Sequence, residues 1–348
     1  MGWQQAFADQ TRACRALGSG LTARVCESLT RAIAADQGPV GRRVKSWPGD
    51  PAVGADSLPL RLCGALHALV LSEQAPDLAR AYAMGGGVDL DRVIADIIQQ
   101  HDRPILEFIE HAPQTNEVGR SAVLIAGAWF LGRMTQPAAF ELLELGASAG
   151  LNLNFPRYSL ADEKGFQPTL AGEPASALRL APLWRGTPPQ PAALAITGAQ
   201  GVDLNPLDPQ RDGARLMAYV WADQRDRLAR LRAALSIAAE HPPHVERADA
   251  ADWLETQLAR PASQGRLVYH TVAAQYFPQS TRDRIEAALQ DAGARAAPDT
   301  PLAHLSMEAD GGDGAALRLR LWAGGLREWD LGRADFHGRW LDWQPKEI

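Results

Sequence analysis

The chain has 348 residues, 46% of them hydrophobic, and a formal net charge of -6. This length allows two domains, and this hydrophobic fraction allows a large core. The charge is spread along the chain without a basic block, so neither a nucleic acid nor a membrane surface is indicated as a partner. The three cysteines, Cys14, Cys26 and Cys63, form no C-x-x-C pair, which favours core thiols in a reducing compartment.

No targeting or membrane-spanning segment is expected. The N-terminal residues lack the basic stretch followed by an apolar stretch that is typical of a secretory signal. The longest apolar run, residues 122–131, is much shorter than the ~18 residues that a membrane-spanning helix needs. The sequence therefore predicts a soluble, cytoplasmic protein.

Residues 1–136 are expected to form an all-helical N-terminal domain. Apolar residues recur three or four positions apart, the spacing of one helical face, in residues 7–33, 60–71, 90–98 and 118–131. A loop rich in glycine and proline separates the first two of these segments.

From residue 138 the pattern changes to strands that alternate with helices. Strand-like runs are followed by helical segments, of which the longest is expected to be one helix over residues 212–239. Such alternation indicates a parallel sheet covered on both faces. Near the end, Leu317, Leu319 and Leu321 alternate with arginines before two glycines, which predicts an antiparallel hairpin that closes the sheet edge.

Residues 156–192 stand out within this second domain, residues 137–348. They carry several prolines and glycines, show little periodicity, and are long for a connection inside a compact domain. They are either a lid or substrate loop, or an insertion with small elements of its own.

The first strand of the second domain leads into Glu144-Leu-Gly-Ala-Ser-Ala-Gly150, which fits two chemical signatures. One is the G-x-S-x-G elbow of serine hydrolases, with Ser148 as nucleophile, an acid (Asp249 or Asp252) and a histidine (His304 or His337). That elbow follows a sheet already several strands deep, whereas the residues upstream are predicted to be helical. The hydrolase is therefore the less favoured interpretation.

The second signature is the ligand-binding turn of a Rossmann-like sheet, in which the following helix offers free N–H groups. Leu151 stands where G-x-G-x-x-G would have its third glycine, which disfavours NAD. An acidic residue, one apolar residue and then G-x-S-x-G resemble the first motif of class I S-adenosylmethionine-dependent methyltransferases. "RADAADWL" (247–254) is similar to the segment after their third strand, and "RLVYHTVAAQYF" (266–277) to their fourth strand and the loop that leaves it.

Six stretches together resemble a bacterial family catalogued as domain of unknown function 2332. They are "TNEVGRSA" (115–122), "ELGASAGLNL" (144–153), "GVDLNPLD" (201–208), "ADAADWL" (248–254), "VYHTV" (268–272) and "HGRW" (337–340). The resemblance covers essentially the whole chain. It implies a helical N-terminal region followed by a Rossmann-like methyltransferase sheet, mostly parallel with an antiparallel C-terminal hairpin.

The resemblance to methyltransferases implies S-adenosylmethionine as the cofactor. Glu144 would pair with the ammonium group of its methionine part, Asp249 would face the adenine, and Asp203 would hold the ribose hydroxyls. Asp162 and Glu163 are alternatives for the ribose, because Asp203 lies unusually far from the glycines. The implied cofactor contacts are Glu144, Gly146, Ala147, Ser148, Gly150, Asn152, Asp203, Asn205, Asp249, Ala250 and His270.

His270 leaves the predicted fourth strand beside the expected position of the methyl group. A histidine, which titrates near neutral pH, suits a general base that deprotonates the acceptor, and a hydrogen-bonded core histidine is the alternative. Tyr276 either lines the same pocket, as a second catalytic candidate, or packs as a core residue.

Several further assignments have a structural alternative. Tight packing of a strand on a helix also explains the glycines, and a surface position also explains Glu144. Asp252 is expected to be a helix N-cap. Asn116, Glu117 and Arg120 precede an apolar helix and either cap it or contact the cofactor cleft. His241 and His244 have no third ligand beside them, so no metal site is expected.

The primary hypothesis is an S-adenosylmethionine-dependent methyltransferase that acts on a small-molecule acceptor. The alternative is a protein that binds S-adenosylmethionine without transferring the methyl group, in a regulatory role. The serine hydrolase that uses Ser148 is the third hypothesis.

Overall fold

The computed structural model describes residues 2–84, 88–135 and 139–348. The chain divides into two compact units, residues 1–115 with 212–229 and residues 116–211 with 230–348. The domain boundary expected at residues 136–137 lies outside the described residues. None of the described helices combines the length and the apolar character that crossing a membrane requires.

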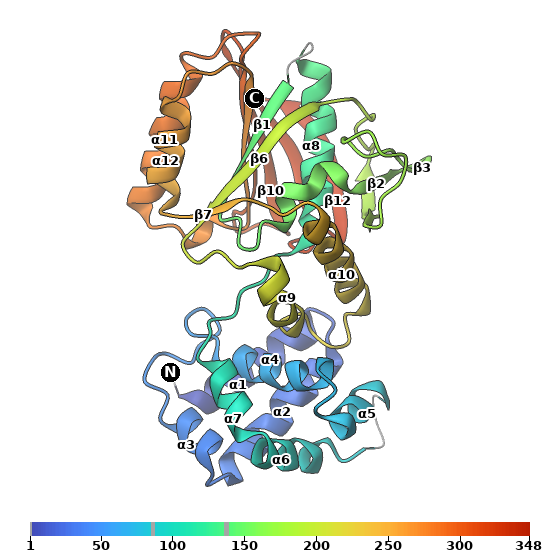
Figure 1. The fold of residues 1–348 in the computed structure, drawn as a ribbon, viewed down its shortest axis with the longest axis vertical. Helices are drawn as coiled ribbons and strands as arrows, with labels where there is room; N and C mark the ends of the chain where they lie inside the picture. Colours follow the sequence, from blue (N-terminus) through green and yellow to red (C-terminus); the bar gives the residue numbers. More distant parts are fainter. Residues whose placement is uncertain (1, 85–87, 136–138) are drawn as a thin grey trace. The chain divides into compact units, whose positions relative to one another are not determined.

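The first unit is built of helices, as the apolar spacing predicts (Figure 1). Fully buried side chains from several helices, among them Phe7, Leu29, Leu62 and Leu66, form its core. The three cysteines are free and buried. The helices are α1 (Trp3–Ala16), α2 (Gly20–Ala35), α3 (Pro39–Lys45), α4 (Leu58–Leu71), α5 (Pro76–Met84), α6 (Leu90–Gln100) and α7 (Asp102–Ile109).

The single helix predicted over residues 212–239 is wrong, because the structure has two helices there. They are α9 (Pro209–Ala218) and α10 (Arg225–Glu240). The break between them contains Asp223, whose carboxylate accepts hydrogen bonds from Ser19 Oγ (2.6 Å) and from the backbone N–H of Leu21 (3.1 Å). A carboxylate at the start of α2 satisfies N–H groups that have no partner inside the helix, which offsets the loss of one continuous helix.

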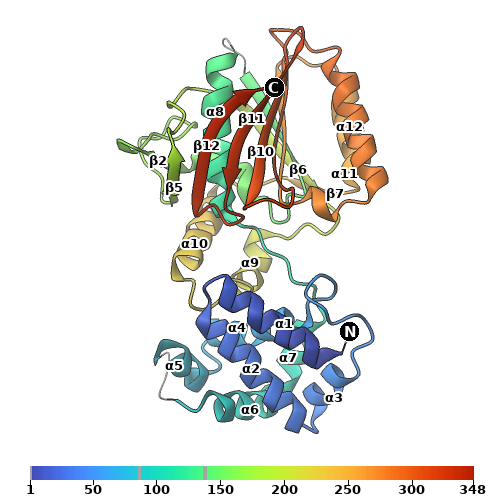
Figure 2. The same ribbon diagram turned by 180° about the vertical axis from the view of Figure 1, so that it is seen from behind.

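The second unit contains a sheet of nine strands in the order β5-β12-β11-β10-β9-β8-β1-β6-β7. β7, β6, β1, β8 and β9 run parallel, and β10, β11 and β12 follow as an antiparallel meander, as Figure 2 shows from the other side. The strands are β1 (Ala139–Leu145), β5 (Leu183–Gly186), β6 (Ala195–Asp203), β7 (Val245–Arg247), β8 (Gly265–Thr271), β9 (Leu302–Ala309), β10 (Ala315–Trp322), β11 (Leu326–Ala334) and β12 (Trp340–Glu347).

The α/β class, the mostly parallel sheet and the β10–β11 hairpin are confirmed. The hairpin does not close the sheet edge, however, because β12 and β5 continue the sheet beyond it. β5 comes from the insertion and pairs in parallel with Trp340–Trp343 of β12. No local pattern predicts this pairing, because it joins segments far apart in the chain.

Residues 156–192 form small elements rather than a structureless loop. A 3-10 helix η2 (Leu151–Arg157) precedes β2 (Ser159–Asp162), β3 (Gly165–Phe166) and β4 (Arg179–Leu180). These strands make a separate sheet in the order β3-β2-β4.

Helices cover both faces of the parallel part of the sheet (Figures 1 and 2). Leu143 and Leu145 pack with α11 (Ala250–Ala259) and α12 (Gln279–Gly293) on one face. On the other face, α8 (Ser121–Met134) approaches β9 so closely that a Cβ at Gly127 would lie 2.6 Å from Leu305 Cδ2. Because side chains alternate along a strand, Glu144 belongs to the α8 face.

Two glycines beside β1 give a matched test of packing against that strand. Gly265 pairs with Phe140, and a Cβ there would lie 2.8 Å from the phenyl ring, whereas a Cβ at Gly198, which pairs with Glu141, would meet nothing within 4 Å. We expect Gly265→Ala to lower the free energy of unfolding by about 1–3 kcal/mol, as overpacking does. Gly198→Ala should be neutral or stabilise by up to about 1 kcal/mol. Urea denaturation measures both, and equal effects would contradict this account of the packing.

Candidate functional site

The carboxyl-terminal edge of the parallel strands has the topology of a ligand site. From β1 the chain continues to β6 and β7 on one side, and later to β8 and β9 on the other. The strand order therefore reverses between β1 and β8. In open α/β sheets, ligands bind outside the carboxyl ends of the strands at such a point.

The turn after β1 requires small residues. Gly146, Ser148 and Gly150 have positive φ of 71°, 56° and 70°. A Cβ at Gly146 would lie 2.7 Å from Ala273 Cβ, and one at Gly150 would lie 2.7 Å from Pro243 Cβ. The turn is thus pressed against the loop after β8 on one side and the residues before β7 on the other.

Most backbone N–H groups of the turn already have partners within the protein. Gly146 and Ala147 donate to Val202 O (2.9 and 3.0 Å), and Ser148 donates to Asp203 Oδ2 (2.9 Å). The expected helix start with free N–H groups is also different, because a 3-10 helix follows the turn and the Leu151 N–H donates to Asn116 Oδ1 (2.8 Å). A ligand here would meet side chains and carbonyl groups more than free amides.

Glu144 is the most unusual acid at this edge. Its side chain is buried, and its Oε2 has no hydrogen-bond partner among the described residues. Burial raises the pKa of the Glu144 carboxyl well above its usual range, with a further contribution from Asp203, while Tyr269 and Arg120 oppose the rise. The surface position considered for Glu144 is wrong. A buried acid of this kind is stable when neutral or when a cation meets it.

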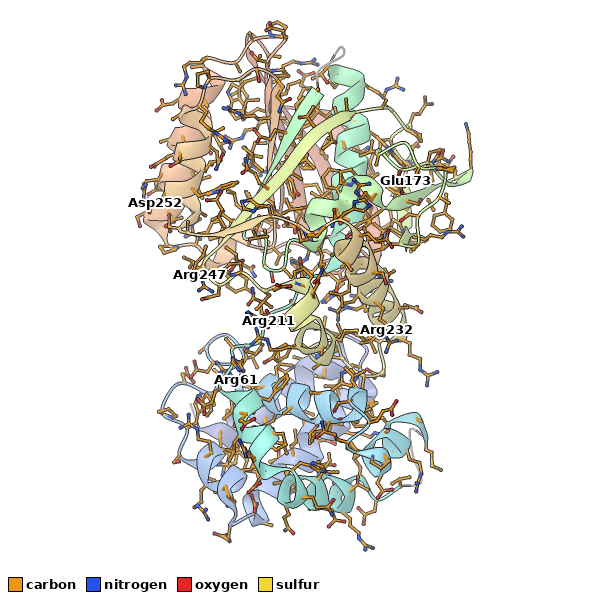
Figure 3. All side chains as sticks on the ribbon, in the orientation of Figure 1. Arg61, Glu173, Arg211, Arg232, Arg247 and Asp252 are labelled. Atoms are coloured by element: carbon orange, nitrogen blue, oxygen red, sulfur yellow. The ribbon has the colours of Figure 1, made fainter. Side chains whose placement is uncertain are left out.

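Asp203 lies at the end of β6, beside the turn. Its Oδ2 accepts from the Ser148 N–H, and its Oδ1 accepts from the Asn205 N–H (2.8 Å). Arg247, at the end of β7 (Figure 3), donates to Asn205 Oδ1 (2.9 Å) and to Leu204 O (3.1 Å). The structure therefore brings Asp203 and Asn205 together with the glycine turn.

Asp162, an alternative to Asp203, has a different position. Its Oδ1 accepts from the Lys164 N–H (2.7 Å) and from Gln167 Nε2 (2.8 Å), so it stabilises the turn between β2 and β3 of the insertion. Glu163 belongs to the same turn.

Asn116 and Glu117 act on the backbone beside the turn. Asn116 holds Leu151, and Glu117 is the N-cap of the 3-10 helix η1 (Val118–Arg120), accepting from the Gly119 N–H (3.0 Å). Asn152, which is buried, accepts from Ser121 Oγ (2.7 Å) at its Oδ1. The start of α8 is thus tied to the residues that follow the glycine turn.

Arg120 joins two loops. It donates from Nη1 to Thr271 O, at the end of β8 (3.0 Å), and from Nε to Phe336 O, between β11 and β12 (2.9 Å). Gly119 also lies close to His337, since a Cβ at Gly119 would be 2.2 Å from His337 O. The segments around residues 116–121 and 337–340, distant in sequence, are therefore adjacent in the fold.

Asp249 is the N-cap of α11. Its Oδ1 accepts from the N–H groups of Ala251 (2.9 Å) and Asp252 (3.3 Å), and Thr281 Oγ1 donates to its Oδ2 (3.3 Å). The prediction that Asp252 caps this helix is wrong. Asp252 lies in the first turn of α11 (Figure 3) and pairs with Arg284 (2.7 Å). Ala250 is the buried first residue of α11.

His270 is not beside Glu144. Since Tyr269 pairs with Glu144 across β8 and β1, His270 points to the opposite face of the sheet. Its Nδ1 lies 2.6 Å from Glu308 Oε1 and its Nε2 lies 3.0 Å from His304 Nε2. Tyr276 is 77% exposed and ends the 3-10 helix η3 (Ala274–Tyr276) after β8.

The acids and histidines considered for a serine hydrolase are engaged elsewhere, and of these His337 lies 3.9 Å from Asp335 Oδ1. His304 uses both ring nitrogens, with His270 and with Arg320 Nη2 (3.0 Å). Asp249 caps α11 and Asp252 pairs with Arg284. Ser148 does have the positive φ of a strained turn, which suits either interpretation of the glycine motif.

A concave surface adjoins the glycine turn. A cavity of 420 Å³ is lined in part by Pro206, Leu207, Pro243 and Val245. Pro243 and Val245 are the residues that a Cβ at Gly150 would strike, so the cavity begins directly behind the turn. Among the described residues, no three His, Cys, Asp or Glu side chains are grouped as a metal ion would need.

The profile of a family described as "Uncharacterized protein conserved in bacteria (DUF2332)" matches residues 4–343. The chain belongs to this family. Among curated proteins there is no match. The DUF2332 segments picked out in the sequence meet at the carboxyl-terminal edge of the sheet, where Asn116, Asp203 and Arg120 connect them.

Sequence reasoning missed Glu308 and Arg320 and named His304 only as a hydrolase candidate, not as a neighbour of His270. The only signal in the sequence for this cluster was that His304 and Glu308 are polar and lie an even number of residues apart in a mostly apolar strand. An even spacing places both on one face of the strand, but which residues oppose them depends on the register of β8, β9 and β10.

The raised pKa of Glu144 predicts a pH-dependent cost to stability. The folded-state pKa of Glu144 lies above its unfolded-state value. The contribution of Glu144 to the free energy of unfolding is therefore fully present below about pH 4.5 and is lost as pH rises through the folded-state pKa. Glu144→Gln removes this titration, so the variant should unfold at higher temperature than the natural protein at neutral pH. The difference should grow with pH, by up to about 1.4 kcal/mol per pH unit between the two pKa values.

Thermal denaturation from pH 5 to pH 9 measures this difference. Glu141→Gln, in the same strand, is the matched control, because Glu141 is only partly buried and accepts from Gln200 Nε2 (2.9 Å). It should give no gain that grows with pH. If the two variants behave alike, Glu144 is not buried in its neutral form.

Proposed function

We propose that the second unit binds S-adenosylmethionine at the carboxyl-terminal edge of its parallel strands and transfers the methyl group to a small-molecule acceptor. Support comes first from the strand order β7-β6-β1-β8-β9, with β1 central and a glycine turn at its end. This order places a switch point where an open α/β sheet binds its ligand.

The observation that carries the proposal is the buried Glu144 carboxyl with an unpartnered Oε2. The ammonium group of the methionine part would supply the missing donor and the missing charge. A buried carboxylate gains more from such a pairing than an exposed one, because water screens it less. Glu144 thus fits a cationic amino acid group, in line with the acidic position of the methyltransferase-like motif.

The neighbouring residues fit the remaining parts of the cofactor. Each Asp203 oxygen accepts one backbone N–H and retains a lone pair that can accept from a ribose hydroxyl. Asp249 and Ala250 begin α11 at the end of β7, on the side expected for the adenine. Gly146 and Gly150 let the turn pack closely against Ala273 and Pro243, which fixes its position at the end of β1.

When bound, the cofactor supplies an electrophilic methyl group. The protein's contribution in this proposal is alignment of the acceptor rather than proton removal, because both ring nitrogens of His270 already have partners. Arg120 and Glu308 hold the loop after β8, which lies next to Gly146. An acceptor that needs no strong base suits such a site.

The engagement of His270 equally favours the second candidate function, cofactor binding without transfer in a regulatory role. The two are separated by turnover, measured as S-adenosylhomocysteine formed in the presence of acceptor candidates. A hydrolase has less support, since its acid and histidine are engaged elsewhere. In either case the buried free cysteines fit a reducing compartment such as the cytoplasm.

Isothermal titration tests the proposal. We expect S-adenosylmethionine and S-adenosylhomocysteine to bind the full chain, and Glu144→Gln and Asp203→Asn each to weaken binding about tenfold or more, since a hydrogen bond to a charged group contributes about 1.5–3 kcal/mol. Asp162→Asn, in the turn of the insertion, should bind like the natural protein. Absence of binding by the natural protein at millimolar ligand would refute the proposal.

The same titration carries a proton signature. Because the pKa of Glu144 is raised in the free protein, pairing with an ammonium group should release a proton from the carboxyl. Affinity should therefore increase with pH, and the heat should depend on the ionisation enthalpy of the buffer. Glu144→Gln should abolish both the pH dependence of the affinity and the buffer dependence of the heat. If either remains in this variant, the released proton comes from another group.

A further inference from the structure

A continuous chain of polar side chains runs along the sheet face that carries α12. Glu286 of α12 pairs with Arg320 of β10 (2.6 and 2.8 Å), and Arg320 Nη2 lies 3.0 Å from His304 Nδ1. His304 Nε2 lies 3.0 Å from His270 Nε2, and His270 Nδ1 lies 2.6 Å from Glu308 Oε1. Both histidines are buried.

The donors fix the direction of every bond in this chain. A guanidinium group only donates, so His304 Nδ1 accepts from Arg320 and the proton of a neutral His304 is on Nε2. His304 Nε2–H then donates to His270 Nε2, which leaves the His270 proton on Nδ1. That proton is donated to Glu308 Oε1. The two histidines are therefore neutral and are opposite tautomers.

The last acceptor in the chain also holds a backbone loop. Glu308 Oε1 accepts from the N–H groups of Ala273 (3.0 Å) and Ala274 (3.2 Å), which follow β8. The loop begins at Val272, whose φ of 54° is unfavourable for a β-branched residue. A conformation of this kind persists only when its surroundings hold it.

We propose that Glu308 and His270 are positioning residues that hold the loop of residues 272–277 in this strained path, and that they do so only while both histidines are neutral. The inference goes beyond the proposed function and does not depend on it, because it concerns the loop in the protein alone. Acid is then expected to release the loop.

A proton added to either histidine breaks the chain. If His270 is protonated, its Nε2–H can be accepted by His304 Nε2 only if the His304 proton moves to Nδ1, where it faces Arg320. If His304 is protonated, its Nδ1–H faces Arg320 directly. The other charged groups near the loop and its anchors are Glu286 and Arg282 of α12 and Arg120, before α8. Arg282 donates to Ala274 O (3.2 Å), and Arg120 donates to Thr271 O, just before the loop (3.0 Å). Glu144 lies on the opposite face of the sheet.

The electrostatics agree in sign with this geometry. Burial lowers the pKa of His304 well below its usual range, and the positive charge of Arg320 lowers it further. The contribution of neutral His304 to the stability of the fold is thus fully present above about pH 6.5 and is lost as pH falls through the folded-state pKa of His304. Although burial opposes it, bonds from His270 and from the N–H groups of Ala273 and Ala274 lower the pKa of Glu308, which is therefore an anion at neutral pH.

Histidine-selective ¹⁵N NMR of the unmodified full chain tests the arrangement directly. At pH 7.5 we expect His304 as the neutral Nε2–H tautomer and His270 as the neutral Nδ1–H tautomer. Loss of the His270 signal in His270→Asn assigns it. An imidazolium at either position, or the same tautomer at both, would refute the chain.

Hydrogen exchange of the Ala273 and Ala274 amides tests the positioning role. Relative to intrinsic rates, we expect at least tenfold faster exchange at pH 5 than at pH 7.5, with the other strands unaffected. Glu308→Ala should give the fast exchange at both pH values, and Glu308→Gln, which keeps an acceptor oxygen, should restore part of the protection. Asp310→Asn is the control, because the exposed Asp310 pairs with Arg333 instead. Unchanged protection in Glu308→Ala would overturn the proposal, whatever the outcome of cofactor titrations.

Discussion

The burial of one carboxyl group constrains the candidate site more than any other interaction. Glu144 alternates with Leu143 and Leu145 along the central strand, and both leucines pack with α11 and α12. A shift of β1 by one residue would bring the acid into that apolar core and the leucines to the α8 face. The register of β1 therefore places an acid in the interior, next to the turn, where burial raises its pKa and a neighbouring cation would favour its ionised form.

The polar residues at this edge of the sheet serve mainly the backbone. Asn116, Asp203, Arg120 and Glu308 each hydrogen-bond a main-chain group near the end of a parallel strand. Irregular segments at the end of a buried sheet must satisfy such groups, because water reaches few of them. Segments far apart in the sequence meet here for that reason, and a polar residue in such a segment is not evidence of a ligand contact by itself.

Local patterns were sufficient for the helical first unit, the parallel strands and the β10–β11 hairpin. The spacing of apolar residues indicates which face of a helix or strand is buried, and this spacing can be read from the segment alone. The turn at Gly146–Gly150 was also recognisable, since positive φ and a close neighbour demand small residues. The break at Asp223 and the edge strand β5 were not, because each depends on a partner more than a hundred residues away.

The same limit applied to the site. Glu144 and Asp203 could be proposed because each is an acid at the end of an apolar strand. For His270 the sequence left open a general base or a hydrogen-bonded core histidine. It places His270 on β8 but does not show that β9 and β10 bring His304 and Arg320 to the same face. Pairing across strands, rather than chemistry within a motif, decides which residues share a site.

The two faces of the sheet respond to pH in opposite directions. On the α8 face, Glu144 favours its neutral form, so the free protein loses stability as pH rises. On the α12 face, the low pKa of His304 makes the protein lose stability as pH falls. A cation at Glu144 would reverse the first dependence, since it favours the carboxylate, and would leave the second unchanged. The groups on both faces would then make the protein most stable at neutral to alkaline pH. In this range the loop after β8 is held and the Glu144 carboxylate is available to a ligand.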